Sequence, residues 1–297
     1  HKAIMLDYLD QRGEADRATE VVGLTRSYSR IASGVAAIAG GVVIFAYGAY
    51  VPLFHLSAAA AVLGWLLMLG YPRNLEGEQQ RAGGAHAAQP SFGERLRTLG
   101  VRPRVAGLLI QSILFESQVK LVRKYYLQPF LKQGLAAVGL PVLGAGALAI
   151  GVVELVADLL GAAGARASTR LERAGGGRPP ALRLAYLAAL AAAIVIAASA
   201  YLGTLWPGVI AAVFAWVLQN ARRPIFVAAF GEHMDKAQRA TSISLESLAR
   251  TVTLSALLPI CGVLADRVGL WAAFALVTGL LALGLAARQP VSAAQPG

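Results

Sequence analysis

Two long stretches of the chain contain no charged side chain. The first runs from Ile31 to Pro72, and the second runs from Leu184 to Ala221. A helix crosses the hydrocarbon core of a bilayer in about 20 residues, so each stretch is long enough to cross a membrane twice. Residues that favour turns interrupt each stretch near its middle, at Tyr47–Pro52 and Gly203–Gly208. The pattern therefore predicts two helical hairpins in a polytopic membrane protein.

Four more apolar segments bring the predicted number of crossings to about eight. Strict alternation of polar and apolar residues is absent, and backbone groups in hydrocarbon must be paired within the protein, so we expect helices and not barrel strands. The predicted fold class is an all-α polytopic membrane protein. The four segments are Val105–Phe115 with a polar half-helix after it, Gln133–Val153, Thr251–Ala265 extended back to a charged start at Ala240, and Val268–Ala287.

The basic residues predict the orientation of these helices. Of the 27 Lys and Arg, 21 lie in blocks that fall on one side of the predicted crossings, and neither hairpin tip carries any. Basic residues gather on the cytoplasmic side of membrane proteins, so we expect that side, with the C-terminus, to be cytoplasmic in an inner or plasma membrane. Arg26 and Arg30 belong to the block before the first hairpin, and Arg222 and Arg223 to the block after the second.

Composition agrees with this picture. The chain is 57% apolar and 14% charged, whereas soluble domains have about 25% charged residues. The net charge of +11 could suit nucleic acid, but the basic residues stand in short blocks between apolar runs, so we exclude that partner. The lone Cys261 has no second cysteine for an internal disulfide and is expected to be a small core residue.

An internal repeat relates the first hairpin to the last two predicted helices, at a constant offset of 222 in the numbering. Six predicted helices separate the two copies, and an even number preserves their orientation in the membrane. The chain therefore holds a parallel repeat. Its identities are Arg17-Ala-Thr19 with Arg239-Ala-Thr241, Ser33 with Ser255, Ile38 with Ile260, and Gly40 with Gly262.

These features resemble the major facilitator superfamily, whose members have two six-helix halves joined by a cytoplasmic loop. The polar, Gly-rich segment Arg73–Pro103 resembles that loop, Gly262–Gly269 (GVLADRVG) resembles the end of helix 11, and Arg222-Arg-Pro224 resembles part of the loop between helices 10 and 11. The resemblance implies helices 5 to 12, with helices 1 to 4 of the same protein missing from this sequence. The expected division is 1–72 for the end of the N-terminal bundle, 73–103 for the central loop, 104–288 for the C-terminal bundle and 289–297 for a cytoplasmic tail.

Candidate cavity residues lie on the predicted helices 7 and 10, which the resemblance places around a central cavity. Charged side chains are costly inside a membrane, so Glu116, about 18 Å beyond Arg104 along a helix, indicates a substrate path. The alternative is a structural pair of Glu116 with Lys120 at i, i+4. Spacing places one set of residues on one face of helix 7, a second set on another face, and a third set at one-turn spacing on helix 10, where Trp216 to Asn220 lie at mid-depth. The three sets are Gln111, Gln118 and Tyr125; Glu116, Lys120 and Arg123; and Trp216, Gln219, Asn220 and Arg223.

The candidates on helix 10 can also be read as contacts that hold helices together. Glu154 and Asp158, and Glu246 with Arg250, are predicted nearer the cytoplasmic end, where they could be gating ion pairs that switch between two packings. The alternative is that these pairs only stabilise the fold.

The expected function is secondary active transport of a small solute by alternating access, coupled to a proton or ion gradient. Glu116 is the candidate proton-coupling residue, because a carboxyl group in low-dielectric surroundings tends to hold its proton. The expected partners are the small-molecule substrate, H⁺ and the lipid bilayer. His55, His86 and His233 have no metal-ligand spacing, and no enzyme activity or cofactor is expected. The alternatives are an inactive or non-transporting truncated membrane protein, or a multi-pass membrane enzyme.

Overall fold

Helices make up all of the regular structure in the described part of the chain. The computed structural model describes Met5, Tyr8, Leu9 and residues 12–70, 103–137, 145–232 and 236–285. No strand occurs within these residues, so the all-α prediction is confirmed. The predicted central loop, 73–103, and the predicted tail, 289–297, lie outside the described residues, apart from Pro103, which begins a helix.

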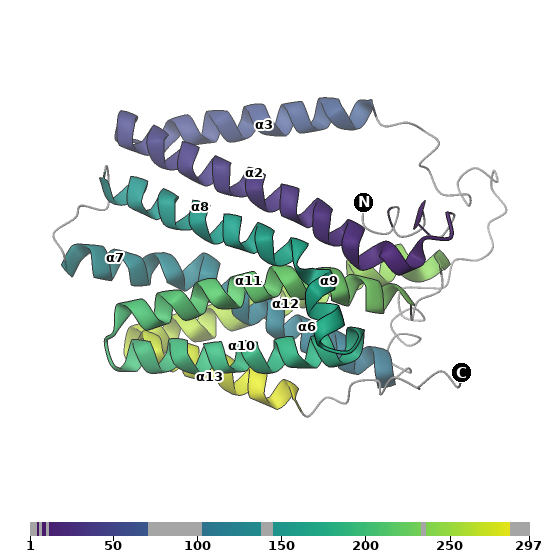
Figure 1. Ribbon diagram of the computed structural model, residues 1–297. Coiled ribbons are helices and arrows are strands. Elements are labelled where there is room, and N and C mark those ends of the chain that lie inside the picture. The colour runs from purple at the N-terminus through teal and green to yellow at the C-terminus, as the bar shows by residue number, and fades with distance from the viewer. Residues whose placement is uncertain are drawn as a thin grey trace.

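Long helices account for most of the described residues. The segments α6, η3 and α7 form one continuous helix, in which η3 is π-helical. Consecutive long helices run in opposite directions across the molecule when this continuous helix is taken as one (Figure 1). The bounds are η1 (Ala15–Arg17), α2 (Ala18–Tyr47), α3 (Val51–Leu69), α6 (Pro103–Lys120), η3 (Leu121–Tyr126), α7 (Leu127–Ala137), α8 (Ala145–Arg166), α9 (Ser168–Ala174), α10 (Arg178–Tyr201), α11 (Leu205–Glu232), α12 (Lys236–Arg267) and α13 (Leu270–Gly284).

Both charge-free stretches form the predicted helical hairpins. The turn between α2 and α3 contains Gly48 at a φ of 62°, and the turn between α10 and α11 contains Gly203 at a φ of 68°. Glycine adopts a positive φ without the steric cost that a Cβ atom brings, so these residues let the chain reverse direction. The two turns lie at the same end of the molecule, which we call the turn end (Figure 1).

Four described helical stretches are long and apolar enough to cross a membrane. They are Ala18–Tyr47, Gly146–Arg166, Arg178–Tyr201 and Ile243–Arg267, and two shorter apolar helices accompany them, Val51–Leu67 and Leu270–Gly284. Large apolar side chains point outward, such as Phe54 and Trp65 of α3, which are 72% and 62% exposed. An exposed apolar surface of this kind is costly in water and favourable in lipid. Helix length and this surface indicate a membrane protein.

Two predicted boundaries are wrong. The crossing expected over Gln133–Val153 does not exist as one helix, because α7 ends at Ala137 and α8, which begins at Ala145 and continues to Arg166, runs in the opposite direction (Figure 1). The second charge-free run ends at Ala221, but α11 continues through Pro224 as far as Glu232. The turns at Gly48 and Gly203 could be predicted from the sequence, but the continuation of α11 past Arg222 and Arg223 could not. These two arginines can be buried within the helix only because they have partners in other helices.

The helix α2 packs along much of its length against α8, with the two running in opposite directions. Glycines allow this close approach: a Cβ atom on Gly41 would lie 3.1 Å from the carbonyl oxygen of Ala147, and one on Gly151 would lie 3.1 Å from that of Ala37. Small residues at a helix interface are the usual means of close packing in membranes. The other face of α2 contacts α3 (Figure 1). The helices α6, α8 and α10 pack against α11, whereas α12 and α13 pack against each other and against α6, and α13 also packs against α10.

Candidate functional site

Five side chains from α2, η3, α8 and α11 form a first polar cluster. We call it the Asp158 cluster, and it consists of Asp158, Glu154, Arg123, Arg30 and Trp216. Arg123 donates Nη1 to Asp158 Oδ1 at 3.0 Å and pairs with Glu154 through Nη2. The indole Nε1 of Trp216 donates to the same Oδ1 at 3.1 Å, and Arg30 Nη1 lies 3.6 Å from it. Asp158 therefore joins three helices through one carboxylate oxygen.

The indole of Trp216 also holds the cations of this cluster in place. The guanidinium of Arg123 lies 3.7 Å from the centre of the Trp216 ring system, and that of Arg30 lies 5.3 Å from it. Contacts of a guanidinium with an aromatic face are favourable, more so away from water. The cluster thus combines ion pairs with stacking, and Arg30 brings α2 into contact with residues much later in the chain.

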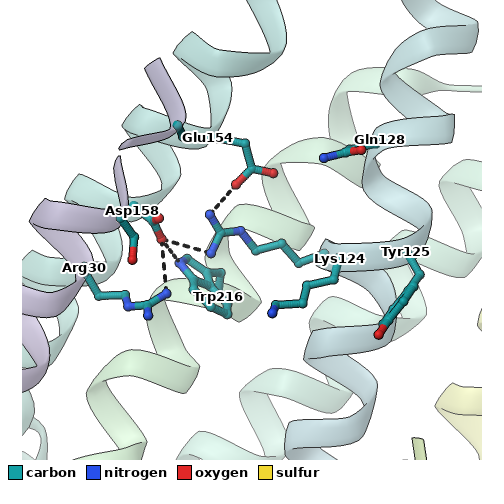
Figure 2. Close-up of a pocket in the computed structure, with 10 residues that line it drawn as sticks. Arg30, Lys124, Tyr125, Gln128, Glu154, Asp158 and Trp216 are labelled. Atoms are coloured by element: carbon teal, nitrogen blue, oxygen red, sulfur yellow. Dashed lines mark hydrogen bonds and ion pairs between the residues drawn. The ribbon is translucent and has the colours of Figure 1, made fainter. Parts of the chain in front are cut away.

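A pocket of about 560 Å³ lies beside the Asp158 cluster (Figure 2). At 1.5 Å per residue, Asp158 and Trp216 lie about 20 Å and 17 Å from the turn-end starts of their helices, within the depth of a bilayer. A pocket of this volume is in the usual range for a small organic ligand. Its lining residues are Arg30, Ser33 and Ala37 of α2, Arg123, Lys124 and Tyr125 of η3, Gln128 of α7, Glu154 and Asp158 of α8, and Trp216 of α11.

Lys124 is the one lining cation without an ion pair to a described residue. The carboxylates of Glu154 and Asp158 are paired with arginines. In Figure 2 the side chain of Lys124 extends from its helix towards Trp216, and Gln128 reaches across from the same side. Tyr125, next to Lys124 in the chain, is 44% exposed. The pocket therefore presents an ammonium group, an amide and an aromatic ring to a ligand.

A second cluster joins α6, α11 and α12, and we call it the Glu116 cluster. It consists of Glu116, Arg223, Glu246 and Arg250. Arg223 Nη1 lies 2.6 Å from Glu116 Oε1, and its Nη1 and Nη2 each donate to Glu246 at 2.8 Å. Arg250 pairs with Glu116 and lies 3.6 Å from Glu246. The side chains of Glu116, Arg223 and Glu246 are at most 3% exposed, so the charges are almost fully removed from solvent.

Both predicted i, i+4 pairs, Glu116 with Lys120 and Glu246 with Arg250, exist in the structure, but each also has partners in other helices. The i, i+4 contact of Glu116 with Lys120 exists at 3.9 Å, but the carboxylate is held more closely by Arg223 and Arg250. Arg250 likewise pairs with Glu116 of another helix, in addition to the predicted Glu246. Ser112 donates to Glu246 at 3.3 Å. Glu116 is thus the centre of an ion-pair network and not an isolated carboxyl group.

A chain of hydrogen bonds lies between the clusters. Arg26 of α2 donates Nε to Asn220 Oδ1 at 2.9 Å, and Asn220 donates Nδ2 to the carbonyl oxygen of Trp216 at 2.8 Å. Seven residues separate Trp216 from Arg223 on α11, which is about 10 Å along a helix. The clusters therefore form two layers, with the Asp158 cluster nearer the turn end.

Cations outnumber carboxylates in this part of the molecule. Arg222, which is 2% exposed, lies over the ring of Phe115 at 4.6 Å, and its Nε and Nη1 have no hydrogen-bond partner in the described structure. We count the charged residues of the two clusters and the pocket lining, together with those bonded to them or next to them in the chain. Four described carboxylates belong to this set, namely Glu116, Glu154, Asp158 and Glu246. The described cations are eight, namely Arg26, Arg30, Lys120, Arg123, Lys124, Arg222, Arg223 and Arg250.

Of the residues predicted on the faces of helices 7 and 10, Arg123, Tyr125 and Trp216 line this pocket. Gln111 donates to the carbonyl oxygen of Gly284 in α13 at 3.3 Å. Gln118 and Gln219 are each 2% exposed. Asn220 is fully buried and accepts the hydrogen bond from Arg26 of α2. Its position therefore agrees with the alternative given above for helix 10, in which its polar residues hold helices together.

The seven-residue face predicted for helix 7 is interrupted by η3. Gln118 is 2% exposed whereas Tyr125, seven residues later, is 44% exposed. The amide of Leu127 donates to the carbonyl oxygen of Val122, five residues back, as in a π-helix. A π turn takes more residues than an α turn, so a spacing of seven across it falls short of two turns. This irregularity places Arg123 at the Asp158 cluster.

Several site residues lay outside the candidates proposed from the sequence. The sequence pattern assigns Arg26, Arg30 and Arg222 only to the cytoplasmic basic blocks, and it assigns Arg223 both to such a block and to the polar face of helix 10. In the structure Arg222 and Arg223 are at most 3% exposed, and all four arginines lie in or beside the polar layers. Their spacing was the available signal, since Arg26 and Arg30 are one turn apart directly before an apolar run. Glu154 and Asp158 were expected nearer a helix end, and the later start of α8 moves both towards its middle.

The described residues contain no group of three or more His, Cys, Asp or Glu that could hold a metal ion. Comparison with known proteins finds no protein-family model that matches the chain, and no curated protein or solved structure that is similar to it.

Proposed function

We propose that this chain is part of a secondary active transporter that moves a small solute across a cell membrane by alternating access. The observation that carries the proposal is the pocket of about 560 Å³, which is charged, lies within the bilayer depth, and is lined by α2 together with η3, α8 and α11. Polar groups at mid-membrane are costly unless they serve a path or a binding site. Transporters bind their substrates near the midplane, between two bundles of helices.

The helix boundaries support the proposed major facilitator arrangement. Adding the offset of 222 to the starts of α2 and α3 gives 240 and 273, and α12 and α13 begin at Lys236 and Leu270. The two hairpins thus begin within four residues of the expected positions. We take α2 and α3 as helices 5 and 6 and the later long helices as helices 7 to 12, which makes eight crossings with a cytoplasmic C-terminus in an inner or plasma membrane.

The Asp158 cluster offers a mechanism for alternating access. Arg30 of α2 is the residue that ties the first hairpin to Asp158 of α8, at 3.6 Å and with 23% of its side chain exposed. A partly hydrated ion pair of this length can separate at moderate cost, whereas Arg123 keeps Asp158 paired at 3.0 Å. Rocking of α2 against α8 would then open and close the pocket without leaving Asp158 unpaired.

Glu116 is the residue we propose for coupling to a proton gradient. Its two nearest cations, Arg223 and Arg250, come from α11 and α12, so neutralising its charge would loosen α6 from both helices. Protonation of Glu116 would therefore change the packing of α6 against α11 and α12 as well as remove a negative charge.

The test uses the full-length protein in proteoliposomes, screened with small solutes under an imposed pH gradient. We expect Glu116→Gln to abolish gradient-driven uptake while substrate exchange continues, which also shows that the variant is folded. Glu20→Gln is the matched control, because Glu20 is an exposed carboxylate near the start of α2. Driven uptake at the wild-type level in Glu116→Gln would end the coupling hypothesis. Absence of saturable uptake for every solute tested would contradict transport.

A further inference from the structure

We infer that the pocket beside the Asp158 cluster binds organic anions that carry an aromatic or other flat apolar group. This inference rests on the proposed function, because it names the substrate class of the same pocket. It follows from the pairing of the lining charges, from the surplus of cations behind them and from the position of one aromatic ring.

The pairing of charges leaves a cation free to meet a ligand. Both carboxylates of the lining are occupied: Glu154 by Arg123, and Asp158 by Arg123, Arg30 and the Trp216 N–H group. Neither is therefore available to a cationic ligand without breaking an existing pair. Lys124 makes no ion pair with any described residue, and its side chain extends over the pocket (Figure 2). A ligand carboxylate or sulfonate can accept a hydrogen bond from this ammonium group and pair with its charge.

The charges in and behind the pocket wall favour the same sign of ligand. The eight cations and four carboxylates described above leave a surplus of positive charge, and Arg26 is bonded there to the neutral amide of Asn220. In a medium of low dielectric constant such charges act over longer distances than in water. The field in the pocket is therefore attractive to an anion and repulsive to a cation.

The pocket also has an apolar surface, the ring of Tyr125, that can contact the apolar part of the ligand. The ring of Tyr125 is 44% exposed and follows Lys124 in the chain, and both line the pocket. The faces of Trp216 are in part covered by Arg123 and Arg30. Tyr125 is therefore the ring available for stacking, with the Gln128 amide as a further donor or acceptor on the adjoining turn.

The test compares three ligands of one shape and different charge: benzoate, benzamide and benzamidine. The full-length purified protein carries Trp65→Phe, Trp206→Phe and Trp271→Phe, which leaves Trp216 as the sole indole within residues 1–297, and any tryptophan outside these residues is likewise replaced by Phe, so that Trp216 alone reports binding by fluorescence. We expect saturable quenching by benzoate, at least about tenfold weaker binding of benzamide, and weaker binding still of benzamidine. Equal binding of all three, tightest binding of benzamidine, or no saturable change with any of them would overturn the inference.

Variants of Lys124 test whether this lysine causes the preference for an anionic ligand. Lys124→Gln should weaken benzoate about tenfold and leave benzamide unchanged, and Lys124→Glu should reverse the preference towards benzamidine. Lys132→Gln is the matched control, since Lys132 is an exposed lysine on the next two turns of the same continuous helix and lies outside the pocket lining. Unchanged benzoate affinity in Lys124→Gln would also overturn the inference.

The outcome separates this inference from the proposed function. A charge preference that depends on Lys124, without driven uptake of any solute in proteoliposomes, would leave an anion-binding membrane protein that does not transport. Driven uptake of a neutral or cationic solute, with no preference among the three probes, would retain the transporter and remove the anion site.

Discussion

The Asp158 cluster and the Glu116 cluster contain the same kinds of residue in different surroundings. Each has two carboxylates and two arginines in ion pairs. In the Glu116 cluster both carboxylate side chains are at most 3% exposed, and all its helices belong to the later part of the chain. In the Asp158 cluster Arg30 and Glu154 are 23% and 19% exposed, and α2 takes part.

The difference indicates two roles for buried charge. Breaking an ion-pair network whose carboxylates are almost fully desolvated is expensive, so we expect the Glu116 cluster to fix the packing of α6, α11 and α12. A partly hydrated network can exchange partners with water or a ligand, and it borders the pocket. Stability is therefore expected to depend mainly on the Glu116 cluster, and ligand binding on the Asp158 cluster.

The largest effect is expected from Arg223→Gln. This change leaves Glu116 and Glu246 close together with fewer cations to neutralise them, and breaking a buried pair in this way costs about 3–5 kcal/mol. Thermal unfolding of the purified protein in detergent measures the loss. The exposed Arg17, whose ion-pair partners among the described residues are Glu14 and Glu20, provides the control as Arg17→Gln. If both variants unfold at the same temperature, the Glu116 cluster does not fix the packing.

A smaller effect is expected from Asp158→Asn. The amide keeps the shape and can still accept from Trp216 Nε1, but it loses the charge that pairs with Arg123 and Arg30. We expect a loss of about 1–3 kcal/mol in the free energy of unfolding and a change in Trp216 emission. A loss as large as that of Arg223→Gln would remove the distinction between the two clusters.

The smallest effect is expected from Arg30→Gln. Its contact with Asp158 is 3.6 Å long and partly exposed, so the free energy of unfolding should fall by about 1 kcal/mol or less. The exchange rate of substrate in proteoliposomes should change more than the unfolding temperature, since Arg30 ties α2 to α8. A stability loss without any change in exchange would make Arg30 a packing residue only.

The sequence predicted the helical hairpins because Gly48 and Gly203 impose reversals through local conformation alone. It predicted Glu116 and Asp158 as polar residues of interest, because a charge in an apolar helix stands out by itself. It did not predict their partners, since an ion pair between α6 and α11 depends on how distant helices meet. It placed Arg222 and Arg223 in the basic block after the second hairpin and did not predict their burial within α11, because Arg223 pairs with Glu116, about a hundred positions away in the chain, and Arg222 lies over the ring of Phe115.

One irregular turn sets which side chains reach the pocket. If η3 became an ordinary α-helix with the same residues, its turn would hold one residue fewer, and everything beyond it would rotate by about 100° and advance by about 1.5 Å relative to α6. Lys124 and Gln128 would then leave the pocket wall, while Glu116, before the π segment, would keep its place. A change from π to α geometry at constant length is therefore a rotational switch for the ligand-facing side of this helix, whereas deletion of one residue between Leu121 and Tyr126 would give an α-helix and leave Gln128 facing the same way.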